Sequence, residues 1–156
     1  MFRPTLFILS LLAGLSSACH AAPLPLGDAV ADIGHRWAHV SYQTPEAGRE
    51  AAFAPLIAYT KQVAQAYPDR AEPMIWEAIV LSSAAKAEGG LGALGKAKAA
   101  RDLLLAAEKI SPTALNGSIY NSLGSLYAKV PGWPIGFGDR KKARTYFEKA
   151  LAINPD

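Results

Sequence analysis

Three residues near the amino-terminal end have side chains that could hold a metal ion: Asp32, His35 and His39. They are separated by three and then four positions, so an α-helix would place them on one side. Two imidazoles one turn apart can share a divalent metal, and a carboxylate can supply the third ligand. The alternative is that both histidines are solvated or hydrogen-bonded on an exposed helix face. Because the sequence shows no fourth ligand, we expect no bound metal and no other cofactor.

Two helices are predicted around these residues. The first spans about residues 28–41, with Asp28 as its N-cap. The second opens after Thr44, which would cap it, and runs to about residue 67. Pro55 lies inside the second helix, so we expect a kink or a break there.

Residues 1–21 are predicted to be a secretory signal peptide. A positive charge at Arg3 is followed by an apolar run over residues 6–15 and then by small residues, which is the order typical of export signals. The apolar run is too short for a permanent membrane helix. We place cleavage after Ala21, which predicts a periplasmic or secreted protein with no transmembrane segment. The alternative is a lipoprotein anchored at Cys19.

The composition favours one helical domain. Of the 156 residues, 51% are hydrophobic, which is enough for a single core, and many of these are alanine, the best helix former. No run of alternating β-branched and aromatic residues predicts a strand. The formal net charge is only +3, so we expect no nucleic-acid binding. Cleavage after Ala21 would also remove the one cysteine, leaving neither a disulfide nor a thiol nucleophile.

The strongest pattern is an internal repeat. In both copies an aromatic residue, Trp76 or Tyr120, lies eight positions after a proline. Periods of about 20–50 residues are typical of solenoids, whose helix-pair units cannot bury their apolar faces alone. The sequence therefore predicts an all-α fold of stacked antiparallel helix pairs. Four further residues recur after 43 positions: Ala100, Leu104, Ala107 and Pro112 return as Ala143, Phe147, Ala150 and Pro155.

The second copy resembles the tetratricopeptide repeat (TPR). That pattern places an aromatic residue, Leu-Gly and Tyr in a first helix, then Ala, an aromatic residue and a late Pro in a second. The resemblance implies a short right-handed TPR-like α-solenoid, in which small residues stand where two helices touch. The matching residues are Tyr120, Leu123, Gly124, Tyr127, Ala143, Phe147, Ala150 and Pro155.

The resemblance divides the chain after the signal peptide into three parts: residues 22–70, which could be a degenerate repeat, a TPR-like repeat over 71–112, and the TPR repeat over 113–156. The middle part has Val80 where the pattern has Gly and Ser83 where it has Tyr, so its helix pair is expected to sit further apart. Both repeats exceed the family length of about 34 residues, because Gly-rich inserts separate their helices. In this they are similar to a subgroup of exported bacterial TPR proteins.

The second insert, residues 130–139, carries Trp133, Ile135 and Phe137 among glycines and prolines. We favour a lid in which these three side chains fold back over neighbouring helix ends, because exposing them together would leave a sticky patch. The alternative is an aromatic pocket or a partner-binding edge with Trp133 and Phe137 as contacts. Neither insert has the Gly-Lys-Ser/Thr ending of a phosphate-binding loop.

By resemblance, the first helix of each repeat lines a concave groove. The partner-binding candidates are Glu77, Asn121, Ser125 and Lys129, together with Trp133 and Phe137 of the insert. The basic cluster with which some family members clamp a peptide carboxylate is missing, and the alternative is a solvated inner face. The groove positions implied by the family are Met74, Glu77 and Leu81 in the first repeat and Ser118, Asn121, Ser125 and Lys129 in the second.

The leading hypothesis is a non-enzymatic scaffold or adaptor that binds a protein or peptide. The alternative is a small-ligand carrier similar to the TPR subunits of periplasmic solute transporters. An enzyme is not expected, because scattered serines and two histidines on one helix form no triad. Phe147, Leu151 and Ile153 of the last helix exceed what one preceding helix can cover. This excess predicts self-association through that helix, or further helices in a longer protein.

Overall fold

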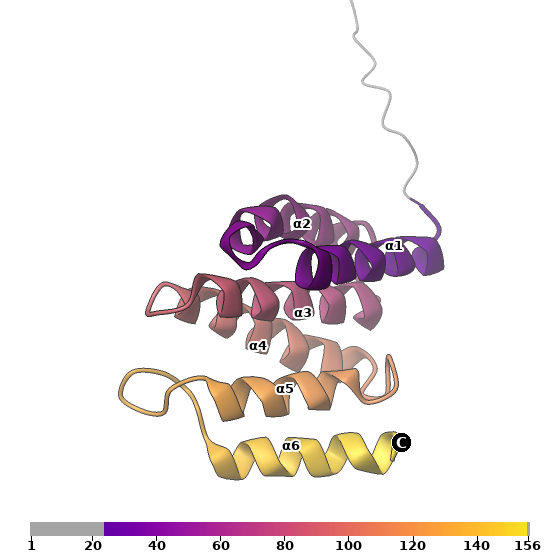
Figure 1. The fold of residues 1–156 in the computed structure, drawn as a ribbon. Helices are drawn as coiled ribbons and strands as arrows, with labels where there is room; N and C mark the ends of the chain where they lie inside the picture. Colours follow the sequence, from indigo (N-terminus) through magenta and orange to yellow (C-terminus); the bar gives the residue numbers. More distant parts are fainter. Residues whose placement is uncertain (1–23, 156) are drawn as a thin grey trace, which may run out of the picture.

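The computed structural model describes residues 24–155 (Figure 1). The predicted signal peptide, its cleavage after Ala21 and the alternative lipid attachment at Cys19 lie outside these residues. The described chain is helical throughout and contains no strand, which confirms the predicted all-α class. Its elements are α1 (Leu26–Ala38), the π-helical turn η1 (His39–Gln43), α2 (Glu46–Ala66), α3 (Ala71–Glu88), α4 (Ala93–Ile110), α5 (Ser118–Lys129) and α6 (Arg140–Ile153).

The helices stack as three successive pairs. Figure 1 shows α1 and α2 at one end of the array, α3 and α4 in the middle and α6 at the other end. Each helix packs on its neighbour in sequence, and α3 also contacts α1 and α5. The predicted solenoid-like arrangement of antiparallel helix pairs is therefore confirmed, with α3 as the helix that joins the end pairs.

Prolines set the carboxyl ends of three helices. In α2, α4 and α6 the residue after the helix is Tyr67, Ser111 or Asn154, with φ of −131°, −153° and −135° respectively. Each of these residues directly precedes a proline, which disfavours the helical conformation in the residue before it. The repeated Pro of the sequence pattern thus ends the second helix of every pair.

The amino-terminal helix starts differ from the prediction. Helix α1 begins at Leu26, with Pro25 rather than Asp28 at the N-cap position. Asp28 instead lies in the first turn, where its charge still favours the positive end of the helix. Helix α2 has Pro45 at its N-cap, and Thr44 uses its carbonyl to accept a hydrogen bond from Arg49 Nε at 2.9 Å.

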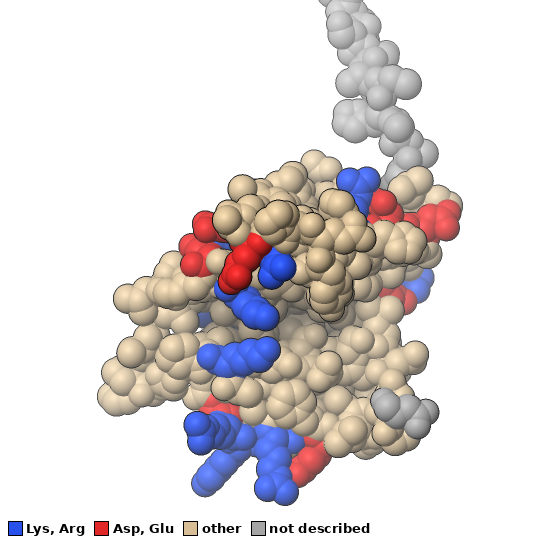
Figure 2. All heavy atoms as spheres, in the orientation of Figure 1, with Lys and Arg blue, Asp and Glu red and all other residues tan. Residues whose placement is uncertain are grey.

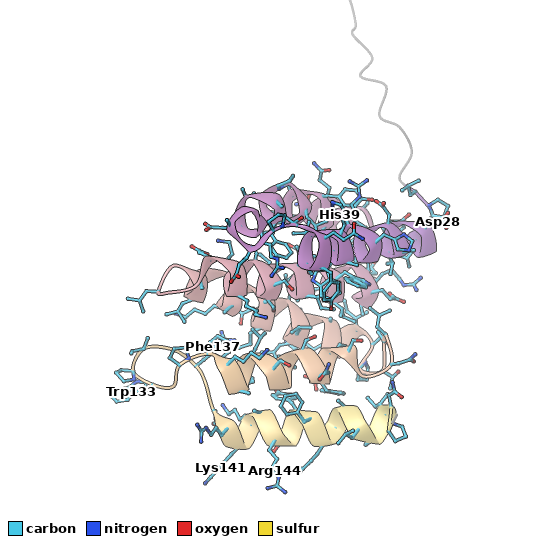
Figure 3. The ribbon with its side chains drawn as sticks, in the orientation of Figure 1. Asp28, His39, Trp133, Phe137, Lys141 and Arg144 are labelled. Carbon is cyan, nitrogen blue, oxygen red and sulfur yellow. The ribbon has the colours of Figure 1, made fainter. Side chains whose placement is uncertain are left out.

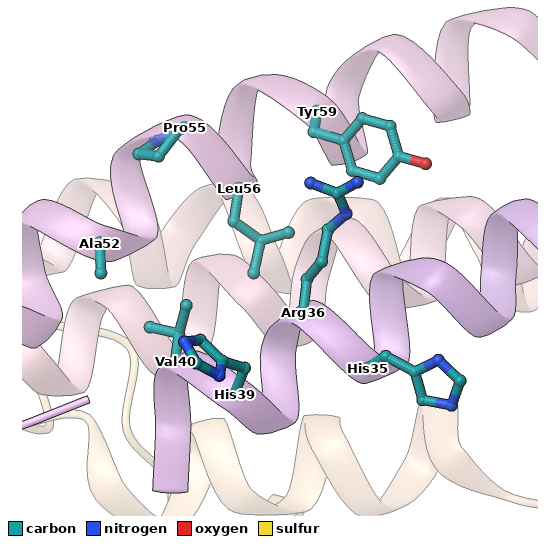
Figure 4. Close-up of a pocket in the computed structure, with 8 residues that line it drawn as sticks. All are labelled: His35, Arg36, His39, Val40, Ala52, Pro55, Leu56 and Tyr59. Carbon is teal, nitrogen blue, oxygen red and sulfur yellow. The ribbon is translucent and has the colours of Figure 1, made fainter. Parts of the chain in front are cut away.

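Pro55 does not break α2, which continues from Glu46 to Ala66. Figure 4 shows Pro55 on the continuous helix, where it is exposed beside the hollow between α1 and α2. Of the two predicted outcomes, a kink or a break, the break into two helices is therefore wrong.

The core consists of two clusters that meet at α3. One cluster joins α1, η1 and α2 with two residues of α3, Val80 and Ala84. The other joins the remaining buried face of α3 with α4, α5 and Ala143 of α6. Both faces of α3 are therefore covered, whereas α6 buries one face only and leaves Leu151 60% exposed.

Two glycines allow close aromatic packing between helices. A Cβ atom at Gly124 of α5 would lie 2.7 Å from the ring of Phe147, so only glycine fits beneath that ring. In the first pair, a Cβ at Gly34 of α1 would lie 3.2 Å from Trp76 of α3. The predicted role of Gly124 as a small residue at a helix contact is confirmed.

Candidate functional site

A groove of about 770 Å³ opens between α1, α3, α5 and the two inserts. Figure 2 shows this hollow below α1 on the face turned to the viewer. Most of its lining comes from the first helix of each pair, which is the side that the repeat pattern predicts to be concave, and the start of α4 adds Leu94 and Ala97. The side chains that line the groove include Trp37, Ile79, Ser82, Ser83, Lys86, Leu91, Leu94, Ala97, Asn121, Ser122, Ser125, Leu126, Lys129, Val130, Pro131 and Ile135.

The lining combines an apolar floor with a basic and hydroxyl-rich rim. Lys86 and Lys129 are both exposed beside it. No Asp, Glu or His among residues 24–155 belongs to this lining. The groove is therefore suited to a ligand with apolar groups and hydrogen-bonding or negatively charged groups.

Three of the predicted contacts come together in this groove. Asn121, Ser125 and Lys129 lie one turn apart along α5 and line the same wall. Their spacing of four residues is what allowed the sequence to place them on one face.

Glu77 does not line the groove. Burial raises the pKa of its carboxyl, and Lys61 of α2 acts in the opposite direction. The side chain therefore lies near α2, on a flank of α3 different from the groove. The family pattern misplaced it because α3 packs against α2 as well as α4, so less of its surface is free than in α5.

The second insert divides its apolar side chains between three environments. Phe137 folds back under Arg101 of α4, whose guanidinium carbon lies 4.5 Å from the ring centre, and packs edge-on against Tyr127. Ile135 is 56% exposed and reaches the groove. Trp133 is 91% exposed at the tip of the insert (Figure 3).

The predicted lid is therefore correct for Phe137 and wrong for Trp133. Backbone hydrogen bonds close the neck of the insert: Gly138 N donates to Pro131 O, and Asp139 N donates to Tyr127 O, each at 2.9 Å. Because the neck is closed, the residues between Pro131 and Gly138 project away from the helices. Trp133 stands at the far end of this projection, beyond the reach of the helix ends.

The proposed metal ligands are not assembled (Figure 4). The carboxylate of Asp32 pairs with Arg36 Nε at 2.8 Å, and His39 Nδ1 lies 2.8 Å from Gln43 Oε1. The rings of His35 and His39 point in different directions in Figure 4. Among residues 24–155, no group of three His, Cys, Asp or Glu side chains is arranged to hold a metal ion.

His35, Arg36 and His39 instead border a hollow of about 420 Å³ between α1 and α2. Arg36 crosses this hollow and places its guanidinium 4.7 Å from the ring centre of Tyr59. A hydrogen bond from Tyr59 is the main cause that lowers the pKa of Asp32, with Arg36 adding to it. His35 and His39 thus lie beside the same hollow, but the carboxylate of Asp32 is paired with Arg36.

Sequence reasoning missed the contribution of α1 to the groove. Trp37 reaches across to α3, where its Nε1 donates a hydrogen bond to Ser83 Oγ at 2.8 Å. A signal was present, because Ser83 stands where the repeat pattern has a tyrosine. A small residue there leaves room that a large side chain of the preceding pair can fill.

The comparisons with known proteins add no relative. No protein-family model matches the chain, and no curated protein was found to be similar to it. Within residues 24–155, each helix is too short or too polar to pass through a lipid bilayer.

Proposed function

We propose that this chain is an exported, non-enzymatic scaffold of the TPR type that binds an extended segment of a protein or peptide in the groove between α1, α3 and α5. The observation that carries the proposal is the groove itself. It runs along the first helices of successive pairs, and repeat arrays present such extended surfaces for binding.

The lining suits an extended peptide. Ile79, Leu94 and Leu126 form an apolar floor for a bulky side chain. Asn121 supplies an amide, and Ser125 a hydroxyl, that can form hydrogen bonds with peptide groups of a bound segment. Lys86 and Lys129 favour a ligand that is neutral or acidic.

The same lining argues against catalysis. A serine nucleophile needs a base within hydrogen-bond reach. Ser82 donates its hydroxyl to the carbonyl of Ala78 at 2.8 Å, and Ser83 accepts from Trp37. These two hydroxyls are thus engaged within α3 and in its contact with α1.

A small-ligand carrier is the second candidate, and the size of the groove favours it. Pockets for small molecules typically span about 300–1,000 Å³, and this groove measures about 770 Å³. A carrier would enclose one molecule, whereas a scaffold would leave the ends of the groove open to a longer chain.

Site-specific photo-crosslinking can test the scaffold. A photoreactive phenylalanine at Asn121 stands in the groove, and the same probe at Ala128 stands on the same helix outside it. We expect a peptide or protein adduct at Asn121 in cells, with the adduct site mapped by mass spectrometry, and none at Ala128. Equal adducts at both positions would remove the groove as the binding site.

Native mass spectrometry of the protein isolated from its own cells separates the two candidates. A bound small molecule that is lost on replacing Ser125 with Arg would favour the carrier. The same preparation tests export, because the mass of the mature chain shows whether cleavage follows Ala21 or lipid is attached at Cys19.

A further inference from the structure

Both inserts project from the same side of the helix stack, on the left in Figure 1, and carry exposed apolar side chains. Trp133 is 91% exposed, Leu91 of the first insert is 74% exposed and Ile135 is 56% exposed. Leu91 and Ile135 border one groove, so the two inserts lie side by side. Large apolar side chains gathered on a surface mark a place of contact with another molecule or a membrane. We call this side of the molecule, which carries Leu91, Trp133 and Ile135, the insert edge.

Basic residues follow directly after the second insert. Arg140, Lys141 and Lys142 form the first turn of α6, and all three are exposed. No ion pair within residues 24–155 engages any of them. Figure 3 places Trp133 at the tip of the insert and Lys141 at the nearby start of α6, and Figure 2 shows Lys and Arg gathered around this end of α6.

The one acidic residue in this segment does not neutralise the basic turn. Asp139 is the N-cap of α6, and its carboxylate accepts hydrogen bonds from the backbone N–H groups of Lys141 and Lys142 at 2.9 and 3.1 Å. The cap holds the start of α6 in place. Lys142 Nζ lies 5.5 Å from the ring centre of Tyr127, and the side chains of Arg140 and Lys141 are exposed beside it. The insert edge is therefore a projecting tryptophan with a cationic surface behind it.

We propose that the insert edge docks on the surface of an anionic phospholipid membrane. Trp133 enters the interface between headgroups and acyl chains, where tryptophan side chains are enriched. Arg140, Lys141 and Lys142 contact the headgroup phosphates, since clusters of exposed basic residues are attracted to anionic lipid. A projecting loop tip suits a membrane better than a folded protein, which would need a pocket to receive the indole.

The side chains proposed to contact the membrane, Trp133 and the basic first turn of α6, lie outside the groove lining, so this docking goes beyond the proposed groove function. It would hold the array at the membrane by its edge, as a peripheral protein. Neither contribution is strong alone, because one interfacial side chain or a few basic residues give reversible binding, and two signals together give stable attachment.

Tryptophan fluorescence can test the proposal. The chain has three tryptophans, all within residues 24–155, so the signal excludes any contribution from residues 1–23. Trp37 and Trp76 are half-buried and pack against each other with ring centres 6.0 Å apart. We expect brominated lipid in vesicles of phosphatidylglycerol and phosphatidylcholine to quench part of the emission. Vesicles of phosphatidylcholine alone should not quench it, and Trp133→Phe should remove the quenching.

Charge variants test the basic surface. Lys141→Gln with Lys142→Gln should weaken the partition of the chain onto the anionic vesicles roughly 20-fold, and added salt should weaken it further. The matched control is Lys61→Gln with Lys109→Gln, which removes two exposed charges from α2 and the far end of α4. The control pair should bind as the parent chain does, and circular dichroism checks that each variant is folded.

Three results would overturn the proposal. The first is an absence of quenching on anionic vesicles, and the second is quenching that Trp133→Phe leaves unchanged. The third is a photoreactive residue at position 133 that captures a protein while the vesicles leave Trp133 unquenched. That last outcome would make the insert edge a protein interface.

Discussion

The middle and last helix pairs share one repeat pattern but differ in how many neighbours cover them. In α4, Ala100, Leu104 and Ala107 are completely buried. Their equivalents in α6 include Phe147 and Ala150, which are only half-buried. The difference arises because α4 lies between α3 and α5, whereas the described chain places nothing on the outer face of α6. Residues at equivalent positions of a repeat can therefore contribute differently to the free energy of unfolding.

The first helices of the two pairs differ in how closely they follow the repeat pattern. Val80 and Ser83 of α3 depart from the repeat pattern, and their equivalents Gly124 and Tyr127 of α5 follow it. Val80 does not hold α3 away from α4, because its side chain packs into the cluster of α1 and α2. Ser83 accepts the hydrogen bond from Trp37. At both positions that depart from the pattern, α3 therefore contacts the first helix pair.

In the last pair, stacked aromatic rings join α5 and α6. Tyr146 of α6 stacks on Tyr127, with ring centres 5.5 Å apart, and on Tyr120 at 6.2 Å. Lys149 adds a cation–π contact with Tyr120 at 4.9 Å. The pair with the more complete repeat pattern is thus the one whose two helices are joined by these aromatic contacts.

The largest expected effect tests this difference in burial. Leu104→Ala removes a fully buried side chain and should lower the free energy of unfolding by about 3 kcal/mol. Phe147→Ala removes a larger side chain from the equivalent position, but its ring is half-exposed, so we expect a loss of about 1–2 kcal/mol. Urea unfolding followed by circular dichroism measures both. A greater loss for Phe147→Ala would show that the last pair is not the less covered one.

A second prediction compares the two glycine contacts. Gly124→Ala places a Cβ atom 2.7 Å from Phe147, and the clash should outweigh the better helix propensity of alanine by about 1 kcal/mol. Gly34→Ala meets Trp76 at 3.2 Å, where the clash and the gain in propensity should nearly cancel, within about 0.5 kcal/mol. Both changes are measured by urea unfolding.

The double variant Gly124→Ala with Phe147→Ala checks the cause of the first loss. Without the ring the clash is gone, so the two losses should not add. Additive losses would mean that Gly124 matters for a reason other than Phe147.

The third prediction concerns the start of α6, which has a side-chain cap, whereas α1 has none. Asp139→Ala should cost about 1 kcal/mol because two backbone N–H groups lose their acceptor. Asp139→Asn should retain most of the stability, since asparagine caps about as well. Asp28→Ala is the matched control, and a loss equal to that of Asp139→Ala would restore Asp28 as a cap.

The sequence predicted the helices well where local rules decide them. Prolines after Tyr67, Ser111 and Asn154 marked three helix ends, and Asp139 marked the start of α6. Apolar spacing identified the core face of α4. These features depend on neighbouring residues alone, so no knowledge of the tertiary structure was needed.

The sequence did not predict features that depend on contacts between distant elements. Glu77 was expected in the groove because its repeat equivalent is Asn121, but α2 covers that flank of α3. Trp133 was expected to fold back, but hydrogen bonds at the neck of the insert project it outward. The sequence of α1 does not follow the repeat pattern, so the pattern did not predict that Trp37 lines the groove.

The smallest expected effect is a pH dependence of stability that distinguishes Glu77 from Asn121. These two residues occupy the same repeat position in α3 and α5. Burial raises the pKa of Glu77 in the folded state, so the folded chain binds this proton more tightly than the unfolded chain does. Stability from this group is therefore full below the unfolded pKa of about 4.3 and is lost as pH rises through the folded value. Glu77→Gln should stabilise the protein at pH about 7.5 and change it little at pH about 3. Asn121→Glu, on an exposed site, should show no such dependence. If urea midpoints of Glu77→Gln and the parent chain differ equally at both pH values, the two positions are electrostatically alike and the contrast between the pairs is one of packing alone.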